Sequence, residues 1–464
     1  MSASESALNT GPVWLRLLSV SAPMSVGILS VLSVGLADAF FLARVGEAEL
    51  AAVGFVYPIT VALTAFAIGI SAGANAALSQ ALGAERDARA VARLALHALI
   101  LGTVIGLILA AALWSRAEAL FSMLGAEEAV LHAVLDYIPF WALSFPVLIA
   151  TMVLEATFRA SGDGVTPAAT MVLTAVLNVA ITPTLAFGVG PIPALGMAGA
   201  GIATLVARSI ALALALYLAV HWSRLSTGWR FATGWWSSVR DIASIGLPAA
   251  TARGINPAAT AIVTAFVAGL GDSFVAGYGA AGRVQAIAMV PYMALASGIS
   301  PVIGQAWGGA LKRRAQTAMR VSLTFVALYG AGLATVLWLY ADPLALLMTD
   351  SGSSAGYAAE YLSIVGLSLG FYGVLLVTNA ALTARSRAGA ALSLSLARIA
   401  GLFIPLSWLG IIWLGYSGMV AATVLANVLA AVGAVILMSR NGLLSFGTGQ
   451  HEAHAEREPK GTSS

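Results

Sequence analysis

The sequence predicts an all-α integral membrane protein, with about twelve transmembrane helices in two six-helix bundles related by a parallel internal repeat. Three observations lead to this fold class. The 464 residues are 59% hydrophobic and only 9% charged, whereas soluble proteins carry about 25% charged residues. Apolar runs of about 20 residues, the length that crosses a bilayer, recur along the chain. The second half also repeats residues of the first at a nearly constant spacing.

The apolar runs divide the chain into five parts. We expect an N-terminal segment at 1–14, a first bundle (the N-lobe) at 15–221, a linker at 222–238, a second bundle (the C-lobe) at 239–439 and a polar, disordered tail at 440–464. The predicted spans are 15–43, 50–80, 91–114, 130–158, 166–188, 195–221, 239–269, 275–305, 316–340, 357–383, 388–413 and 417–439.

An offset of 225 residues relates the two halves of the sequence. Residues that return at this offset include the pairs Ser19 and Ser244, Pro23 and Pro248, Phe41 and Phe266, Gly54 and Gly279, Gln80 and Gln305, and Gly83 and Gly308. Later the offset drifts, and Leu195–Thr204 matches Leu414–Thr423 at 219. Because six crossings are an even number, both halves face the same way, and the substrate path is expected between them.

The loop charges predict the orientation of the chain. One set of loops contains most of the basic residues, among them Arg86, Arg89, Arg93, Lys312, Arg313 and Arg314. The opposite set is rich in acids, among them Glu47, Glu49, Glu127, Glu128, Asp272 and Asp342. By the positive-inside rule the basic loops and both termini are cytoplasmic. We expect a multi-pass protein of the plasma (inner) membrane.

The composition also excludes several functions. The chain has no cysteine, so disulfides, thiolate catalysis and cysteine-based zinc sites are ruled out. The net charge of +3 is too small to indicate nucleic-acid binding. There is no Walker A sequence, and the G-x-S-x-G pattern at Gly69–Gly73 lies inside an apolar span rather than at a strand-to-helix turn. We therefore expect neither an enzyme nor a bound metal or cofactor.

Asp38 is an acid within the first predicted span. On insertion scales an aspartate at the bilayer centre costs about 2.5–3.5 kcal/mol, and such residues usually mark an ion or substrate pathway. A structural alternative pairs Asp38 with Arg44, but residues six apart are not neighbours on a helix. The duplicated position is Val263. The repeat thus keeps prolines and glycines that serve the fold but drops this acid, which favours a functional role.

Polar residues in the fifth and sixth spans form a second candidate group. Asn178 and Thr182 are four residues apart, on one face of a helix. Pro183 leaves the carbonyl of Val179 without its usual partner, so the segment could present an amide oxygen, a hydroxyl and a free carbonyl to a cation. The alternative is a kink repaired by neighbouring helices. Thr204 recurs as Thr423, which suggests packing.

Two stretches resemble a known transporter family. They are "GLADAFFLARVGEAELAAVGFVYPI" (35–59) and "FRASGDGVTPAATMVLTAVLNVAITPTLAFG" (158–188) with the following "LGMAGAGIAT" (195–204). These stretches resemble the multidrug and toxic compound extrusion (MATE) family, in its DinF-like branch. The resemblance covers nearly the whole chain. It implies efflux of amphipathic compounds in exchange for Na⁺ or H⁺.

The resemblance assigns roles to individual residues. Asp38 matches the first-helix acid of the family's cation site, Pro23 the proline where that helix bends, Asn178 the fifth-helix asparagine and Thr204 the sixth-helix threonine. Where relatives often have a second acid, this chain has Thr182. Na⁺ must be held by several oxygens, and a second carboxylate would help to offset its dehydration. We therefore expect H⁺ rather than Na⁺ as the coupling ion.

Further residues are candidates for lining the substrate cavity. The aromatic candidates are Phe40, Tyr57, Tyr137 and Tyr278, although spacing does not show which way they face. Arg253, Arg283 and Arg398 lie deep in second-half spans, where they could favour an anionic substrate or tie helix ends together. Arg283 is a candidate for the positive charge near Asp38, provided that the eighth span faces the first. Glu155 is expected to pair locally with Arg159.

The leading hypothesis is a secondary antiporter that exports amphipathic small molecules, such as drugs and toxic compounds, by alternating access between the two lobes. One alternative is an exporter or flippase of an anionic or lipid-linked metabolite, which the arginines would suit. Another is a non-transporting membrane protein or channel, although the sequence shows no filter or charged ring. The expected partners are the small-molecule substrate and the lipid bilayer, and we expect a monomer.

Overall fold

The computed structural model describes residues 8–222, 225, 233–349 and 352–444. These residues form helices, with one isolated β-bridge between Val189 and Ile192. In chain order the helices are α1 (Val13–Val45), α2 (Glu47–Gly83), α3 (Ala88–Met123), α4 (Glu128–Ala160), α5 (Val165–Phe187), α6 (Gly196–His221), α7 (Trp235–Ala268), α8 (Asp272–Ala288), α9 (Val290–Gly308), α10 (Lys312–Leu339), α11 (Ala341–Met348), α12 (Gly352–Gly366), α13 (Leu369–Ala384), α14 (Ala388–Leu396), the π-helix η1 (Ala397–Phe403) and α15 (Ile404–Arg440).

Two predicted spans are bent pairs of helices rather than single helices. Among the described residues, eight helices are long and apolar enough to cross a membrane, or up to ten if each bent pair is one span. The pairs are α8 with α9, bent by 42°, and α12 with α13, bent by 59°. Pro291 lies in the first turn of α9, where a proline without an N–H ends the preceding helix.

The last two predicted spans lie within a 53-residue helical stretch, Ala388–Arg440. The chain reverses inside it, because Gly415 has a non-helical backbone with φ of +63°. A Cβ added to Gly410 would overlap the carbonyl of Gly418, so the two arms lie side by side. Helix α7 has the length of a span but carries Arg253 and Asn256 near its middle. Each predicted span thus has a helical counterpart.

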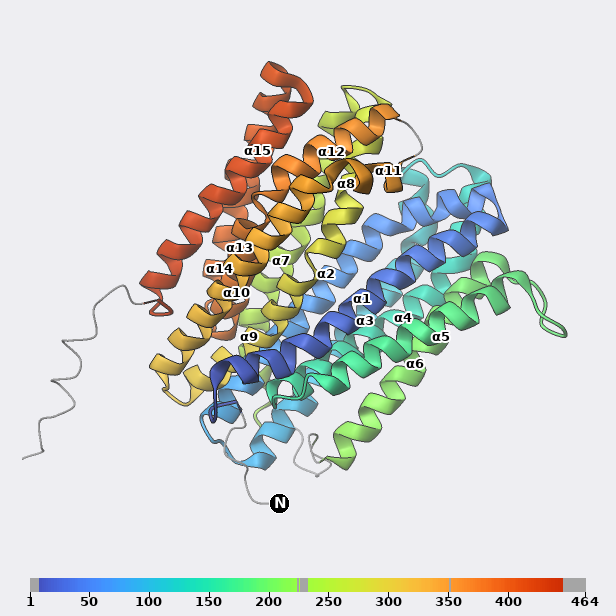
Figure 1. The fold of residues 1–464 in the computed structure, drawn as a ribbon. Helices are drawn as coiled ribbons and strands as arrows, with labels where there is room; N and C mark the ends of the chain where they lie inside the picture. The colour runs from blue at the N-terminus through green and yellow to red at the C-terminus, as the bar shows by residue number, and fades with distance from the viewer. Residues whose placement is uncertain (1–7, 223–224, 226–232, 350–351, 445–464) are drawn as a thin grey trace, which may run out of the picture.

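The helices form two bundles, as predicted (Figure 1). In the N-lobe, α4 packs against α2, α3 and α6, while α5 packs between α1 and α6. In the C-lobe, α8 packs against α12, α9 against α13, and α7 against α14. Most of the predicted linker and the predicted disordered tail lie outside the described residues.

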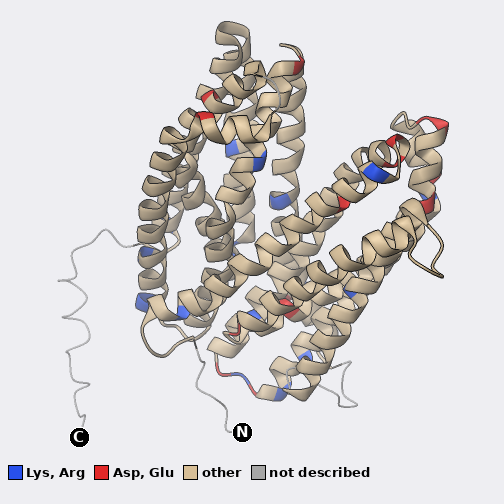
Figure 2. Cartoon of the chain, turned by 45° about the vertical axis from the view of Figure 1, so that its right-hand side comes forward, with Lys and Arg blue, Asp and Glu red and all other residues tan. Residues whose placement is uncertain are grey.

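The two lobes meet at one end of the molecule. Figure 2 shows that they diverge away from the end at which α1 begins and α15 finishes, which we call the termini end. Contacts between the lobes are made by α2 with α7 and by α1 and α2 with α9. At the termini end, Gln305 donates a hydrogen bond to the Ala160 carbonyl at 2.7 Å, and Gln80 donates one to the Ala384 carbonyl at 2.6 Å. The repeated glutamines therefore each bind the opposite lobe.

Candidate functional site

Four of the predicted site residues form a continuous polar chain inside the N-lobe. The hydroxyl of Thr182 lies 3.5 Å from Asp38 Oδ1 and 3.4 Å from Asn178 Oδ1. Asn178 Nδ2 in turn donates to Thr204 Oγ1 at 3.2 Å. The chain joins α1, α5 and α6, which are distant in sequence but packed together. We call Asp38, Asn178, Thr182 and Thr204 the acid centre.

Local helix geometry explains how this chain assembles. Asn178 and Thr182 are one turn apart on α5 and are both buried, so they share one face. Pro183 lies inside the same helix and Pro23 inside α1, and both helices continue through the proline. The Thr204 hydroxyl also bonds the Ala200 carbonyl at 3.0 Å, one turn back on α6. That bond fixes the Thr204 oxygen as the acceptor for Asn178.

Arg208 is a residue of this site that the sequence analysis missed. It follows Thr204 by one turn on α6, and its Nη1 donates to Ser144 Oγ on α4 at 2.6 Å. The guanidinium interacts electrostatically with Asp38, but the two side chains do not form a direct ion pair. The sequence does show a feature that could have identified it, namely a single arginine within the apolar stretch Gly196–His221. Its position relative to Asp38 depends on how α6 packs, which the sequence does not show.

Tyr137 also reaches the acid centre. It lies on α4, hydrogen-bonds Thr204 and interacts electrostatically with both Asp38 and Arg208. Its ring stacks on Trp141 with centroids 5.9 Å apart. Among the aromatic candidates for the cavity, Tyr137 is therefore the one placed beside the acid.

The other cavity candidates lie elsewhere. Phe40 and Tyr57 are 53% and 66% exposed, and Arg44 stacks over the Phe40 ring at 4.1 Å. The absence of an Asp38–Arg44 pair agrees with the argument from helix spacing. Tyr278 is buried in the C-lobe, edge-to-face with Tyr361.

The predicted proximity of Arg283 to Asp38 is wrong. Arg283 lines a separate cavity of about 420 Å³ in the C-lobe, with residues of α8, α11 and α12. The structure instead places Arg208 near the acid. The error arose because the prediction required α8 to face α1, whereas α8 packs mainly against α12.

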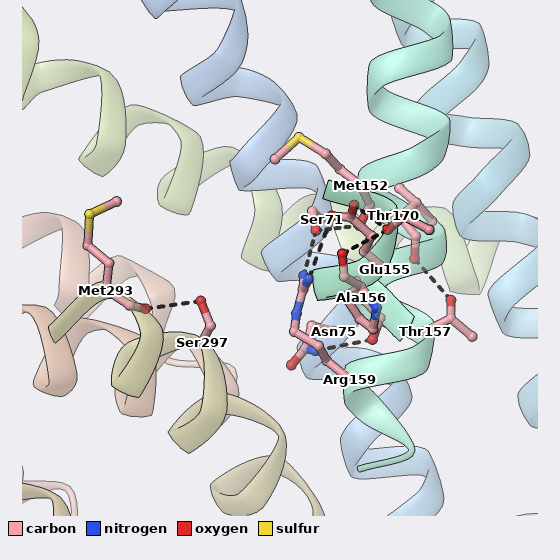
Figure 3. A network of polar contacts seen from close by, with 12 residues as sticks. Ser71, Asn75, Met152, Glu155, Ala156, Thr157, Arg159, Thr170, Met293 and Ser297 are labelled. Atoms are coloured by element: carbon pink, nitrogen blue, oxygen red, sulfur yellow. Dashed lines mark hydrogen bonds and ion pairs between the residues drawn. The ribbon is translucent and has the colours of Figure 1, made fainter. Parts of the chain in front are cut away.

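A second buried acid, Glu155, is neutralised within the N-lobe (Figure 3). Its carboxylate lies 3.8 Å from Arg159 Nη1, as expected for residues four apart, and accepts a bond from Thr170 at 3.1 Å. Arg159 also donates to Ser71 at 3.3 Å, which links α4 to α2. Because every charge here has a partner on the same lobe, this network is best explained as structural.

The chemistry available at the acid centre is that of a small cation site. It offers one carboxylate, one amide oxygen and two hydroxyls, all hard oxygen ligands. Arg208 supplies a fixed positive charge that opposes a second cation. Within the described part of the chain, no group of three or more His, Cys, Asp or Glu side chains could hold a metal.

Two repeated helical bundles, with an acid inside the first that has no direct ion-pair partner, define a two-lobed secondary transporter. The chain belongs to the MATE family, since the MatE family model matches residues 23–184 and again 248–409. The two matches are offset by 225 residues, which confirms the predicted repeat.

Comparisons with individual proteins agree with this family. The chain is 33% identical over 438 residues to an FAD transporter of Shewanella oneidensis, covering 93% of this chain and 96% of the relative. It is 24% identical to a multidrug export protein of Staphylococcus haemolyticus, covering 89% and 92% of the two chains. Its structure matches the MATE transporter VcmN of Vibrio cholerae in the bent form, with a TM-score of 0.87, 26% identity and coverage of 92% and 96%.

Proposed function

We propose that this transporter couples uptake of a proton at Asp38 to export of an anionic amphipathic molecule of the flavin dinucleotide type. The observation that carries the coupling role is the hydrogen-bonded acid centre, in which one carboxylate is tied to α5 and α6 through Thr182, Asn178 and Thr204. A change at the carboxylate can thereby alter the packing of three helices. The position has no acid in the second lobe, where the repeat has Val263.

A proton fits this centre better than Na⁺. Thr182 stands where a second carboxylate would offset the dehydration of a metal ion. Arg208 interacts with Asp38 and would compete with Na⁺ for the same negative charge. A proton, by contrast, needs only one carboxylate whose environment differs between two conformations.

The substrate class rests on the similarity to the FAD transporter and on the charges within the lobes. Arginines lie deep in the predicted spans of this chain, and such residues face a cavity or pair with acids or backbone carbonyls more often than they face lipid. An anionic substrate was the alternative that the sequence left open. The relatives with multidrug names, at 22–24% identity, support the export of amphipathic drugs as a second candidate.

Alternating access between the lobes would then carry the substrate across. We take the termini end as cytoplasmic and the membrane as the plasma membrane. The lobes then meet on the cytoplasmic side and diverge toward the outside. Proton binding to Asp38 would repack α1 against α5, with α1 bending at Pro23, and would displace the substrate. The presence of the acid of the proposed cation site in the first lobe is also the basis for assigning the chain to the DinF-like branch.

Reconstituted vesicles would test this function. We expect purified protein to move FAD against its gradient when a proton gradient is imposed, and riboflavin, which lacks the phosphates, to be moved poorly. FAD movement can be followed by its fluorescence. A Na⁺ gradient at clamped pH should have little effect. Transport of cationic dyes without transport of FAD would support the drug exporter instead.

The orientation is testable by cysteine labelling, since the native chain has no cysteine. Lys312 begins α10 at the termini end, and Asp342 lies in α11 at the opposite end. We expect Lys312→Cys to react with an impermeant maleimide only after cells are opened, and Asp342→Cys to react in intact cells. External labelling at position 312 would reverse the proposed orientation.

A further inference from the structure

The C-lobe contains a buried guanidinium that is not paired with an acid. Arg398 lies in the π-helix η1 and is only 7% exposed. Its Nε and Nη2 donate to Asn427 Oδ1 at 3.2 and 2.9 Å, and its Nη1 donates to Asn256 Oδ1 at 3.2 Å. Among the described residues no carboxylate pairs with it. The acceptors are neutral amides, so the charge is held in position without being neutralised.

A second arginine lies near the first. Arg253 precedes Asn256 by three residues on α7, so the two share a face of that helix. It interacts electrostatically with Tyr372, whose ring lies 4.4 Å below the Arg398 guanidinium. Arg253 is exposed although α7 packs against α2 at this level, where a Cβ on Gly254 would contact Ala65. Helix α7 lies at the junction of the lobes, and arginines in membrane-spanning helices almost always face the bundle interior or a water-filled cavity rather than lipid.

Comparison of the repeats shows that this cluster belongs to the C-lobe alone. At the 225 offset Arg253 corresponds to Ile28, and across the range of offsets from 225 to 219 Arg398 corresponds to a position within 173–179, which contains no arginine. The serine is shared, but its partner differs: Asn427 donates to Ser368 at 2.9 Å in the C-lobe, where the N-lobe has Arg208 donating to Ser144 at 2.6 Å. The N-lobe combines one acid with one arginine at its centre, whereas the C-lobe combines two arginines without an acid.

We propose that Arg398 and Arg253 form an anion-binding site for a phosphate or pyrophosphate group of the transported molecule. Three of the five guanidinium N–H groups of Arg398 are used by the asparagines, which leaves one on each terminal nitrogen for a ligand. Two such donors can bind a phosphate at two points, which lysine cannot reproduce. The phosphate class rests on the proposed function, while the anion site itself rests on the geometry.

The site has a direct binding test that does not depend on transport. We expect ADP and inorganic pyrophosphate to bind purified wild-type protein and to compete with FAD. Arg398→Gln should weaken their binding by about tenfold or more, since it removes charge-assisted bonds. Arg398→Lys should recover only part of the affinity. Arg440→Gln at the end of α15 removes the same charge far from the site and serves as the matched control.

The results of these binding experiments distinguish a failure of the proposed anion site from a failure of the proposed FAD export. Unchanged pyrophosphate affinity in both Arg398→Gln and Arg253→Gln, with folded protein by size-exclusion chromatography, would overturn the anion site even if FAD is exported. Loss of pyrophosphate binding in these variants without any FAD export would support the site and reject the proposed substrate. Competition by anionic lipid micelles but not by ADP would identify a lipid headgroup and overturn the assignment to a transported phosphate compound.

Discussion

Asp38→Asn is expected to abolish proton-driven export while leaving the protein folded and inserted. Asparagine has nearly the same shape and can still accept the Thr182 bond, so the packing of α1 against α5 should survive. It cannot take up a proton, however, so the two conformations lose their dependence on the proton gradient. We expect accumulation against a gradient to fall by about tenfold or more.

The measurement should separate coupling from substrate binding. Vesicles containing the variant should still exchange labelled FAD for unlabelled FAD, because exchange needs no net proton movement. Their transport should be flat across pH, whereas that of the wild type should respond to an imposed gradient. Asp136→Asn is a suitable control, since Asp136 is exposed and, within the described part of the chain, pairs with His132 on its own helix. Gradient-driven export by Asp38→Asn at the wild-type rate would show that the coupling proton binds elsewhere.

The fold was largely predictable because span lengths and the internal repeat can be read directly from the sequence. Span length follows from bilayer thickness, and the repeat is visible as identical residues at a constant offset. The bends between α8 and α9 and between α12 and α13 were not predicted. Each lies within an apolar run long enough to be read as one helix, and hydropathy carries no information on helix direction.

The residues of the acid centre were predicted mainly through their family resemblance. Physical reasoning added that Asn178 and Thr182 share a helix face, and the structure places Thr182 beside Asp38 and joins Asn178 to it through Thr182. Arg208 and the error over Arg283 show the limit of this reasoning. The positions of Arg208 and Arg283 relative to Asp38 depend on how their helices are rotated about their axes within the bundle. That rotation is set by contacts between distant segments, such as the bond from Arg208 to Ser144.

The termini end of the structure is closed by a pair of glycines related by the repeat. A Cβ on Gly83 would overlap the backbone carbonyl of Gln305, and a Cβ on Gly308 would overlap that of Gln80. The two lobes therefore touch backbone to backbone at both positions. The side chains of the same glutamines bond carbonyls of the opposite lobe. Alternating access requires this contact to form and to break in every cycle.

Replacing both Gly83 and Gly308 by alanine is expected to prevent this closure and to reduce transport to about a tenth or less. In a helix interior alanine is more favourable than glycine by about 1 kcal/mol, and neither of these helix-terminal glycines has a positive φ, so backbone preference would not oppose the substitution. A loss of transport would therefore come from the contact between the lobes. The control is the double variant Gly54→Ala and Gly279→Ala, at another repeated pair whose added Cβ atoms meet open space.

The accessibility of position 79 reports directly on whether the two lobes are closed at the termini end. Ser79 is buried between the lobes, where its Cβ would be the nearest contact of a Cβ on Gly304. A cysteine at position 79 should be protected from maleimide in the closed arrangement. It should become reactive in the Gly83→Ala, Gly308→Ala background, because the lobes can no longer meet at the termini end, and it should stay protected in the control background. Normal transport together with continued protection of position 79 would show that the backbone contact can relax, and that closure does not depend on these two glycines.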